Sequence, residues 1–441
     1  MSLRRRRVDT RREAEKNRAA EPRPTRSTAT DMLAVLVLRG VALGGRFVFI
    51  IFATKYMLPG DFGRFGILAA LAAFIPGVVG LEAYQVLLRR ILQEPARASD
   101  TRRFYAIFVL SGSLMSGVLG AVTLAVFGWS TATISLGSAI LALEHIGMET
   151  ARNLINERRP TLSVLSAALR TGAWGVAVPA LFFIGVIPAP WTFETVLWYW
   201  LVGAIGAAIA GIPIWHLFRP TTKDLHLRNS FRLLKEVAGY SRTWMVYILG
   251  LKGIDMGGRF VCAFMISEAA AGRFTFLSMV ASLSYVAQKG VVEPIYYPRL
   301  IELEATEASY RQFRQINFAV ITGASILSIL ALAATSWLNS SVLPGSELTS
   351  FGLLLLGFAL LSLSQPAHYR LYRAGMDRVI MLSGVIGCAA MVVASLAATP
   401  LWGVSGAAAG MMLGSMLLLG IKSRAARKFA IAASPDIPRP A

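Results

Sequence analysis

Runs of mostly apolar residues, each about 20 residues long, recur along almost the whole chain. A helix of about 20 residues crosses the hydrocarbon core of a bilayer, and only helices and closed barrels satisfy their backbone hydrogen bonds there. The sequence is 55% hydrophobic and 15% charged, against about 25% charged in ordinary soluble proteins. We therefore expect an all-α polytopic membrane protein whose twelve transmembrane helices lie near residues 32–54, 65–88, 104–128, 131–151, 161–186, 194–217, 238–264, 274–292, 315–337, 348–369, 379–399 and 402–421.

The Lys and Arg residues between these runs predict which side of the membrane each connection faces. With a cytoplasmic N-terminus, 35 of the 44 Lys and Arg residues fall in cytoplasmic tails and loops, and only Lys55, Arg64 and Arg273 fall in external loops. Cytoplasmic connections of membrane proteins are enriched in Lys and Arg. We therefore expect both termini in the cytoplasm, and the net charge of +20 requires no nucleic-acid partner.

The same pattern divides the chain into five parts. Residues 1–30 contain ten Lys and Arg and are predicted to form a disordered basic tail in the cytoplasm. This tail either fixes the topology or binds anionic lipid or a regulatory partner. The other parts are an N-terminal six-helix lobe (31–217), a cytoplasmic linker (218–237), a C-terminal six-helix lobe (238–421) and a cytoplasmic C-terminal tail (422–441).

One short segment occurs twice, in the first and the seventh predicted helix. Residues 38–48 read LRGVALGGRFV and residues 251–261 read LKGIDMGGRFV, with seven of the eleven positions identical. Such a repeat indicates a duplicated unit. Because each unit contains an even number of predicted helices, we expect two parallel six-helix repeats related by an axis along the membrane normal.

Four basic residues of this repeat lie at membrane depth. Arg39 and Arg46 are seven residues apart, as are Lys252 and Arg259, so each pair shares one helix face. Basic residues in lipid are costly and by default face a cavity or a partner. We expect the four to line a central cavity, where they outnumber Asp255, the carboxylate on the same face. The excess positive charge favours an anionic substrate, and guanidinium groups suit phosphate.

An alternative interpretation pairs these cations within the protein. Asp255 would be one partner, and Glu82 and Glu293, at equivalent places near the cytoplasmic ends of the second and eighth helices, would be others. Arg170 and Lys289 are further basic residues inside predicted helices, and they either line the cavity or pair with carboxylates.

The fourth predicted helix carries a second group of ionisable residues. Glu144 and His145 are adjacent, and His145, Glu149 and Arg152 follow one another at helical spacing. A carboxylate beside a histidine can relay protons or hold a coupling cation. The alternative is an ion-pair cluster near the cytoplasmic end of the helix.

The sequence contains no motif of a hydrolytic or nucleotide-driven enzyme. It has no Gly-x-Ser-x-Gly elbow, no Walker A loop and no His pair with metal-ligand spacing. Cys262 and Cys388 lie in apolar runs, which predicts buried thiols and no disulfide. We therefore expect a protein that is not an enzyme and that uses no cofactor or metal. Several aromatic residues are expected in the interfacial belt, namely Trp191, Trp198, Tyr199 and Trp200.

Two connecting segments resemble a known family. Residues 58–66 (LPGDFGRFG) are similar to its L-x-P-x-x-F-G entry to the second helix, and residues 372–376 (YRAGM) to its cytoplasmic turn between helices ten and eleven. Together with the duplication and the topology, these segments resemble the polysaccharide-transporter (Wzx-type) branch of the MOP flippase superfamily, which also includes lipid II flippases and MATE drug exporters. The resemblance covers about residues 31–425, and the basic tail is outside it.

This resemblance implies a MATE-like fold in which two lobes form a V-shaped bundle that opens alternately to each side of a bacterial inner membrane. The implied substrate is an undecaprenyl-pyrophosphate-linked oligosaccharide, flipped to the outer leaflet for polysaccharide export and driven by an ion gradient or the membrane potential. Membrane lipids and the polymerase and export machinery of the same pathway would be the partners. The family's pyrophosphate contacts match Arg39, Arg46, Lys252 and Arg259 here.

Two other functions stay open. A cation-coupled multidrug exporter of the same fold should have an acidic cavity, which the four basic residues argue against. A membrane glycosyltransferase or polymerase of the same pathway usually needs a large external loop, and the predicted external loops of this chain are about ten residues or shorter.

Overall fold

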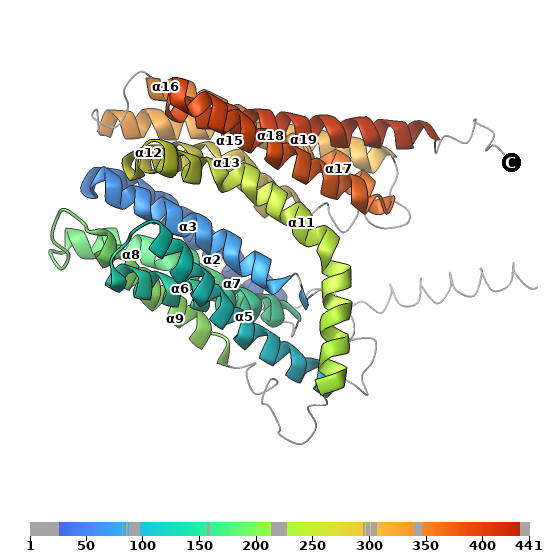
Figure 1. Cartoon of the computed structure of the whole chain (residues 1–441), viewed down its shortest axis with the longest axis horizontal. Coiled ribbons are helices and arrows are strands. Elements are labelled where there is room, and N and C mark those ends of the chain that lie inside the picture. The colour runs from blue at the N-terminus through green and yellow to red at the C-terminus, as the bar shows by residue number, and fades with distance from the viewer. Residues whose placement is uncertain are drawn as a thin grey trace, which may run out of the picture.

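Figure 1 shows the computed structural model of the chain, which is helical throughout the residues that it describes. These are residues 26–81, 83–84, 87, 98–156, 159–212, 227–293, 296, 300, 307–338 and 346–432. Within them the one β-type contact is an isolated bridge between Met57 and Trp191. Most of the basic tail, with residues 1–25, lies outside the described part.

The N-terminal half forms one group of helices, drawn in blue to green in the lower part of Figure 1. Pro59 begins α3 at a position where its missing N–H costs nothing, and the Thr192 side chain caps α9 by accepting from the Thr195 N–H. The elements are α2 (Arg26–Tyr56), α3 (Pro59–Gly80), α5 (Ala98–Val126), α6 (Thr131–Asn156), α7 (Pro160–Ala168), η2 (Leu169–Ala173), α8 (Trp174–Phe183) and α9 (Phe193–Ile209).

The C-terminal half forms a second group, drawn in yellow-green to red in the upper part of Figure 1. Its elements are α11 (Leu227–Met265), α12 (Glu268–Ala281), α13 (Leu283–Ala287), η4 (Gln288–Val292), α15 (Glu307–Leu338), α16 (Ser346–Leu363), α17 (Gln365–Arg373), α18 (Asp377–Trp402) and α19 (Val404–Ala432). The helix α11 begins inside the predicted linker 218–237, and α19 continues past residue 421 into the predicted tail.

Nine helices of the described part are long and apolar enough to cross a membrane. The predicted spans 194–217, 238–264 and 274–292 fall on α9, on α11 and on the run from α12 to η4. The first of these is short, the second carries many polar residues, and the third is interrupted by a π-helical turn. An all-helical, multi-pass membrane protein is therefore confirmed, and the count of twelve spans stays a prediction.

The two halves pack their helices in the same way. In the first half α2 packs against α7, η2 and α8, which form the fifth predicted span. In the second half α11 packs against α18, which is the fifth predicted span of that half. Likewise α6 packs against α9, and α16 packs against α19. Equivalent helices thus have equivalent neighbours, as a duplicated unit requires.

The halves meet most closely where α3 crosses α12 (Figure 1). Glycines allow this contact, because a Cβ at Gly63 would lie 1.8 Å from the Glu268 carbonyl oxygen and one at Gly272 would lie 2.7 Å from the Pro59 carbonyl oxygen. The Glu268 carboxylate on α12 accepts hydrogen bonds from Arg64 on α3 at 2.8 Å and from Trp129 at 2.9 Å. The charge distribution predicts that this junction is at the external side of the membrane.

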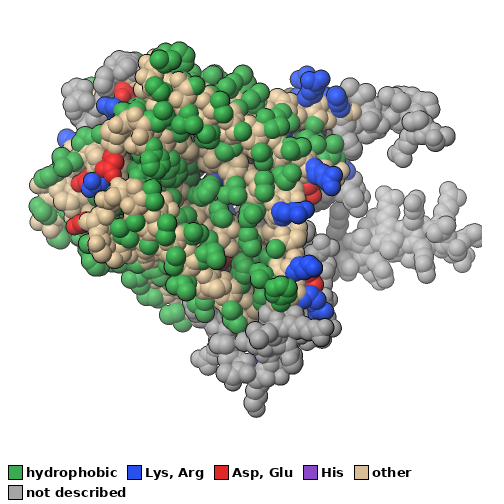
Figure 2. All heavy atoms as spheres, in the orientation of Figure 1, with side chains coloured by type: hydrophobic (Ala, Val, Ile, Leu, Met, Phe, Trp, Pro, Cys, Tyr) green, Lys and Arg blue, Asp and Glu red, His purple; other side chains and the backbone are tan. Residues whose placement is uncertain are grey.

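The opposite end of the molecule is basic. Figure 2 shows Lys and Arg side chains gathered at the end where the N-terminal part of α11 and the C-terminal part of α19 lie in Figure 1. There α11 reaches across to the first half, where Leu233 and Val237 pack with Ala83, Phe104 and Tyr105. This arrangement agrees with the predicted cytoplasmic location of that end.

Candidate functional site

A cavity of about 310 Å³ lies between the two halves. Its wall comes from α2, α3, α6, η2, α8 and α9 of the first half and from α11 of the second. Four basic side chains and one acidic side chain line it, namely Arg46, Arg152, Arg170, Lys252 and Glu144. The volume is within the usual range of ligand sites, and the charge of the lining is positive.

Arg46 is the basic residue of this wall that has no ion pair or hydrogen bond with another described residue. It is partly exposed, and it lies on α2, the first helix of the duplicated unit. The carboxylates of Asp255 and Glu144 lie near enough to interact with its charge, but neither is within 4.0 Å. Its guanidinium donors are therefore available to a ligand.

Arg170 and Glu144 form an ion pair across the wall of the cavity. The Arg170 Nη1 and Glu144 Oε2 atoms are 2.5 Å apart, and the Trp200 Nε1–H donates to Glu144 Oε1 at 2.8 Å. Trp200 stacks on Trp174 with the ring centroids 5.4 Å apart. The Arg170 cation balances the charge of Glu144, the Trp200 N–H satisfies its second oxygen, and the two indole rings make an apolar wall beside it.

Arg152 is held in a similar way at the end of the cavity nearest the basic side. Its guanidinium donates to Glu149 at 2.6 Å and lies over the ring of Tyr84. Glu149 also accepts a hydrogen bond from the Tyr105 hydroxyl. Glu149 is buried and does not line the cavity, so it serves here as a partner of Arg152.

Lys252 and Arg259 extend the basic surface along α11. The Lys252 Nζ lies 4.0 Å from Asp255 Oδ2, a long contact for an ion pair. One turn beyond Asp255, Arg259 is buried and donates to the carbonyl of Gly66 on α3 at 3.5 Å and to the Ser278 hydroxyl on α12 at 3.3 Å. Arg259 therefore joins the two halves at the closed end of the site, and the charges of Arg46 and Asp255 act on it.

An apolar groove lies along the other side of α3. It has a volume of about 450 Å³ and is lined by α3, α5 and α11, with Leu71, Phe74, Met256 and Phe260 in its wall. Lys252 lines both this groove and the basic cavity. Lys252 thus lies where a polar compartment meets an apolar one.

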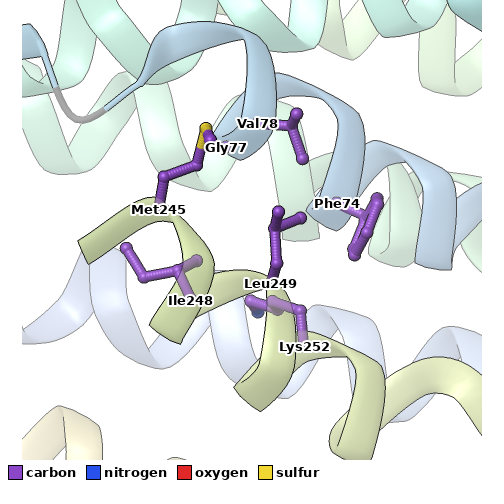
Figure 3. Close-up of a pocket in the computed structure, with 7 residues that line it drawn as sticks. All are labelled: Phe74, Gly77, Val78, Met245, Ile248, Leu249 and Lys252. Carbon is purple, nitrogen blue, oxygen red and sulfur yellow. The ribbon is translucent and has the colours of Figure 1, made fainter. Parts of the chain in front are cut away.

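A narrow gap lies between these two spaces. Figure 3 shows Phe74, Gly77 and Val78 of α3 facing Met245, Ile248, Leu249 and Lys252 of α11. The gap holds only about 10 Å³. In this conformation the α3–α11 seam therefore separates the basic cavity from the groove.

The structure brings together only some of the residues predicted for the site. Arg39 is exposed, donates to the Gly290 carbonyl at 3.4 Å and does not line the cavity. Glu293 pairs with Lys289 at 2.8 Å on the second half. Glu82 lies outside the described residues.

His145 also lies away from the cavity. It is fully buried, and it packs so closely on α5 that a Cβ at Gly112 would lie 2.5 Å from its Nε2 atom. Neither of its ring nitrogens has a hydrogen-bond partner among the described residues. The predicted roles of His145 and its neighbours in ion coupling stay predictions.

Other residues of the cavity were not predicted with it. Trp200, expected in the interfacial belt, is 5% exposed and lines the cavity, and Trp191 is 1% exposed inside the core. Trp198 is 57% exposed, as a belt residue should be. The adjacent positions 198 and 200 fall on different faces of one helix, and a helical projection of α9 would have separated them.

Comparison with known proteins addresses the fold. No known family model and no curated protein matches the sequence. Among solved structures, the inward-facing conformation of a multidrug resistance MATE family transporter of the MOP superfamily superimposes with a TM-score of 0.66 at 15% identity, covering 92% of this chain and 100% of that one. The chain has the fold of the MOP transporters. Lipid II flippase MurJ, in an inward closed conformation, gives a TM-score of 0.61 at 10% identity, covering 90% of this chain and 87% of MurJ.

The MOP fold agrees with the architecture expected from the sequence. A MATE in a straight conformation also matches, with a TM-score of 0.59 at 14% identity over 91% of this chain and 94% of that one. Multidrug transporters and a lipid flippase thus share this fold, so the fold confirms the MATE-like prediction without selecting the Wzx-type branch. Substrate class must be argued from the residues of the cavity.

Proposed function

We propose that this MOP-fold chain is a flippase for a lipid-linked saccharide that carries a pyrophosphate, such as an undecaprenyl-pyrophosphate-linked oligosaccharide. The observation that carries this proposal is the excess of positive charge in the cavity. Five cations line it or close its end (Arg46, Arg152, Arg170, Lys252 and Arg259), and three carboxylates lie among them (Glu144, Glu149 and Asp255). Within this group of described residues, the five positive charges exceed the three negative charges by two.

This surplus matches the chemistry of a pyrophosphate diester, which carries one negative charge on each phosphate. Arg46 offers a guanidinium without an ion-pair partner in the described part of the chain, and Arg forms bidentate hydrogen bonds with phosphate oxygens. Lys252 offers an ammonium with only one long contact to Asp255. A buried anion would be costly without such partners.

The amphiphilic character of such a lipid supports the same proposal. The pyrophosphate and saccharide would occupy the basic cavity beside Trp174 and Trp200, and the hydrocarbon chain would lie in the apolar groove. Lys252 lines both spaces, so the polar and apolar parts of one molecule could meet beside it. Opening of the α3–α11 seam in Figure 3 would let the chain pass between them.

The proposed mechanism is alternating access. The present conformation is closed where α3 crosses α12, at the predicted external side. Binding of the anion by basic residues from both halves would favour approach of the halves at the cytoplasmic side and release of the external junction. We place this cycle in a bacterial inner membrane, with the saccharide passed to the polymerase and export machinery.

A multidrug exporter of the same fold is the second candidate, because MATE transporters are among the matching structures. A cavity for cationic drugs should present unpaired carboxylates. Glu144, the carboxylate of this lining, already pairs with Arg170 and Trp200. The lining therefore favours an anionic substrate.

The test is transport by the purified full chain in proteoliposomes. One assay would follow a fluorescent undecaprenyl-pyrophosphate-linked saccharide between leaflets, and a parallel assay would follow ethidium, a cationic dye. Our proposal predicts movement of the lipid and no concentration of the dye. Concentration of ethidium without lipid movement would overturn the proposal in favour of the drug exporter.

A further inference from the structure

A lysine outside the cavity is buried without a carboxylate partner. Lys422 lies on α19, near its cytoplasmic end, and its side chain is 0% exposed. Its Nζ donates to the Tyr247 hydroxyl of α11 at 2.9 Å and lies 4.8 Å from the centre of the same ring. No Asp or Glu of the described residues lies within 4.0 Å of it.

This environment is unfavourable for a permanent positive charge. Transfer of an ammonium group from water to a low-dielectric interior is very costly unless an anion and several hydrogen bonds compensate for it. Lys422 has one hydroxyl and one aromatic face, and these offset only part of that cost. The neutral amine is therefore the form that fits this conformation.

The groups that surround Lys422 come from four elements. Tyr247 of α11 stacks on His368 of α17, with the ring centroids 5.4 Å apart. Lys289 of η4 is the cation whose charge reaches Lys422 and His368, and it is paired with Glu293. From α18, Val379 and Ile380 belong to the apolar cluster that also contains Tyr247 and Ala426.

The other charged residues of α17 and α18 at this end of the second half are at least partly exposed, and on α18 these are Asp377, which is partly exposed, and Arg378, which is exposed. Arg370 of α17 pairs with Glu307 and lies over the Tyr310 ring, and Arg373 is exposed. On α19 itself, Arg424 and Arg427 are exposed. Lys422 is thus buried, whereas Arg424 and Arg427 on the same helix are exposed. Among the described basic residues of α19, Lys422 is the one that donates to Tyr247.

Polar atoms nearby also lack partners. His368 Nδ1 and both side-chain polar atoms of Gln365, one turn earlier on α17, are buried without hydrogen bonds among the described residues. Buried polar atoms of this kind are normally satisfied by water. Water would supply the route by which a proton reaches the amine from the cytoplasmic end.

One helix links this pocket to the substrate cavity. Tyr247 of α11 contacts Lys422, whereas the next residue, Ile248, lines the basic cavity, as does Lys252 one turn later. A movement of α11 that opens or closes the cavity must therefore also move the partner of Lys422. The two sites share α11, which gives a physical connection between them.

We propose that Lys422 is a proton-binding site whose occupancy changes with the conformation of the two halves. In the present conformation the amine is neutral and has no exposed surface. When α11 moves away from α19 and water enters, the amine lone pair binds a proton to form an ammonium ion, and the proton must leave before the pocket can close again. Proton binding thus favours the alternative conformation.

The experiment measures conformation, without any substrate, so its result does not depend on what the chain transports. Spin labels would be placed on Ile155→Cys at the end of α6 and on Gln312→Cys on α15, both exposed at the predicted cytoplasmic side, in a full chain with Cys262→Ala and Cys388→Ala. Their distance distribution would be recorded in nanodiscs between about pH 5 and pH 9. A single linked proton changes the ratio of two populations by up to about tenfold per pH unit.

For the wild type we expect a second population to grow as the pH falls. Lys422→Met, which removes the charge but keeps the side-chain length, should hold the alkaline distribution at every pH. Lys422→Arg, which keeps a permanent charge, should hold the acidic distribution. Arg424→Gln removes an exposed charge from the same turn of α19 and should titrate like the wild type.

Three results would overturn the proposal. They are a wild-type distribution that does not change with pH, a Lys422→Met variant that titrates like the wild type, and a pH dependence that His368→Gln removes while Lys422→Met does not. If Lys422→Met fails to fold, Lys422→Gln replaces it and is subject to the same criteria. Thermal unfolding of each variant in detergent serves as the folding control.

Discussion

Arg259 on α11 donates a hydrogen bond to the backbone carbonyl of Gly66 on α3, and so a basic residue of the repeated segment joins the two halves. Arg46, its counterpart in the first copy, lines the cavity without an ion-pair partner among the described residues. Two positions that are equivalent in sequence therefore have different surroundings. Of the four basic residues of the repeat, Arg46 and Lys252 line the cavity, whereas Arg39 and Arg259 do not.

Substitution of Gly63 should open the predicted external junction. A Cβ at this position would lie 1.8 Å from the Glu268 carbonyl oxygen, a backbone atom that cannot move without displacing α12. We expect Gly63→Ala to increase the labelling of Ser278→Cys, buried behind this junction, by a membrane-impermeant maleimide in a Cys262→Ala/Cys388→Ala background. A tenfold rise would correspond to about 1.4 kcal/mol.

Gly60→Ala is the matched control for this prediction. A Cβ at Gly60, one turn earlier on α3, meets no atom within 4 Å. Ser278→Cys in the Gly60→Ala protein should therefore react with the maleimide at the same rate as in the protein with Gly60. Equal labelling in the Gly63→Ala and Gly60→Ala proteins would show that the α3–α12 contact does not hold this side closed.

The Arg170–Glu144 pair should show strong energetic coupling. Both side chains are largely buried, and loss of one member of a buried pair leaves a charge without a partner, which costs about 3–5 kcal/mol. We expect Arg170→Met and Glu144→Gln each to lower the unfolding temperature in detergent. The double variant should be more stable than the sum of the single effects predicts, and additive effects would contradict the pairing.

A large side chain at Gly77 should block the seam between the cavity and the groove. Gly77 lines both the basic cavity and the gap in Figure 3, and a Cβ there meets no atom within 4 Å. We expect Gly77→Trp to reduce lipid flipping by roughly tenfold or more, about 1.4 kcal/mol or more on the barrier, and thermal unfolding in detergent checks that the variant is folded. Gly352→Trp, at an equally open and exposed glycine of α16, should transport normally. Unimpaired flipping by Gly77→Trp would exclude the seam as a route for the hydrocarbon chain.

The fold was largely predictable because membrane-length apolar runs and the Lys and Arg asymmetry act over many residues. The duplication at 38–48 and 251–261 also predicted which helices have equivalent neighbours. The predicted spans on α9, α11 and α12–η4 were less secure, because polar residues and a π-helical turn weaken their hydropathy signal.

The site was less predictable, because helical spacing defines a face and not what the face contacts. The helical spacing of Glu149 and Arg152 was compatible with the ion pair that they form, but the sequence does not indicate that Tyr105 donates to Glu149 or that Trp200 reaches Glu144 across 56 positions. Lys422 is the first residue of the predicted cytoplasmic tail (422–441), whereas in the structure it is buried on α19 against Tyr247. Such contacts depend on how the halves pack.

The central claim is that Arg46 binds the pyrophosphate of a lipid-linked saccharide, and a lipid-flipping assay on Arg46 variants in proteoliposomes tests it most directly. We predict that Arg46→Gln reduces flipping by at least tenfold, because a charge-assisted contact contributes about 1.5–3 kcal/mol, and that Arg46→Lys restores part of the activity. Lys55→Gln, which removes an exposed charge from the far end of the same helix, should flip lipid at the wild-type rate. Wild-type flipping by a folded Arg46→Gln protein would contradict the account.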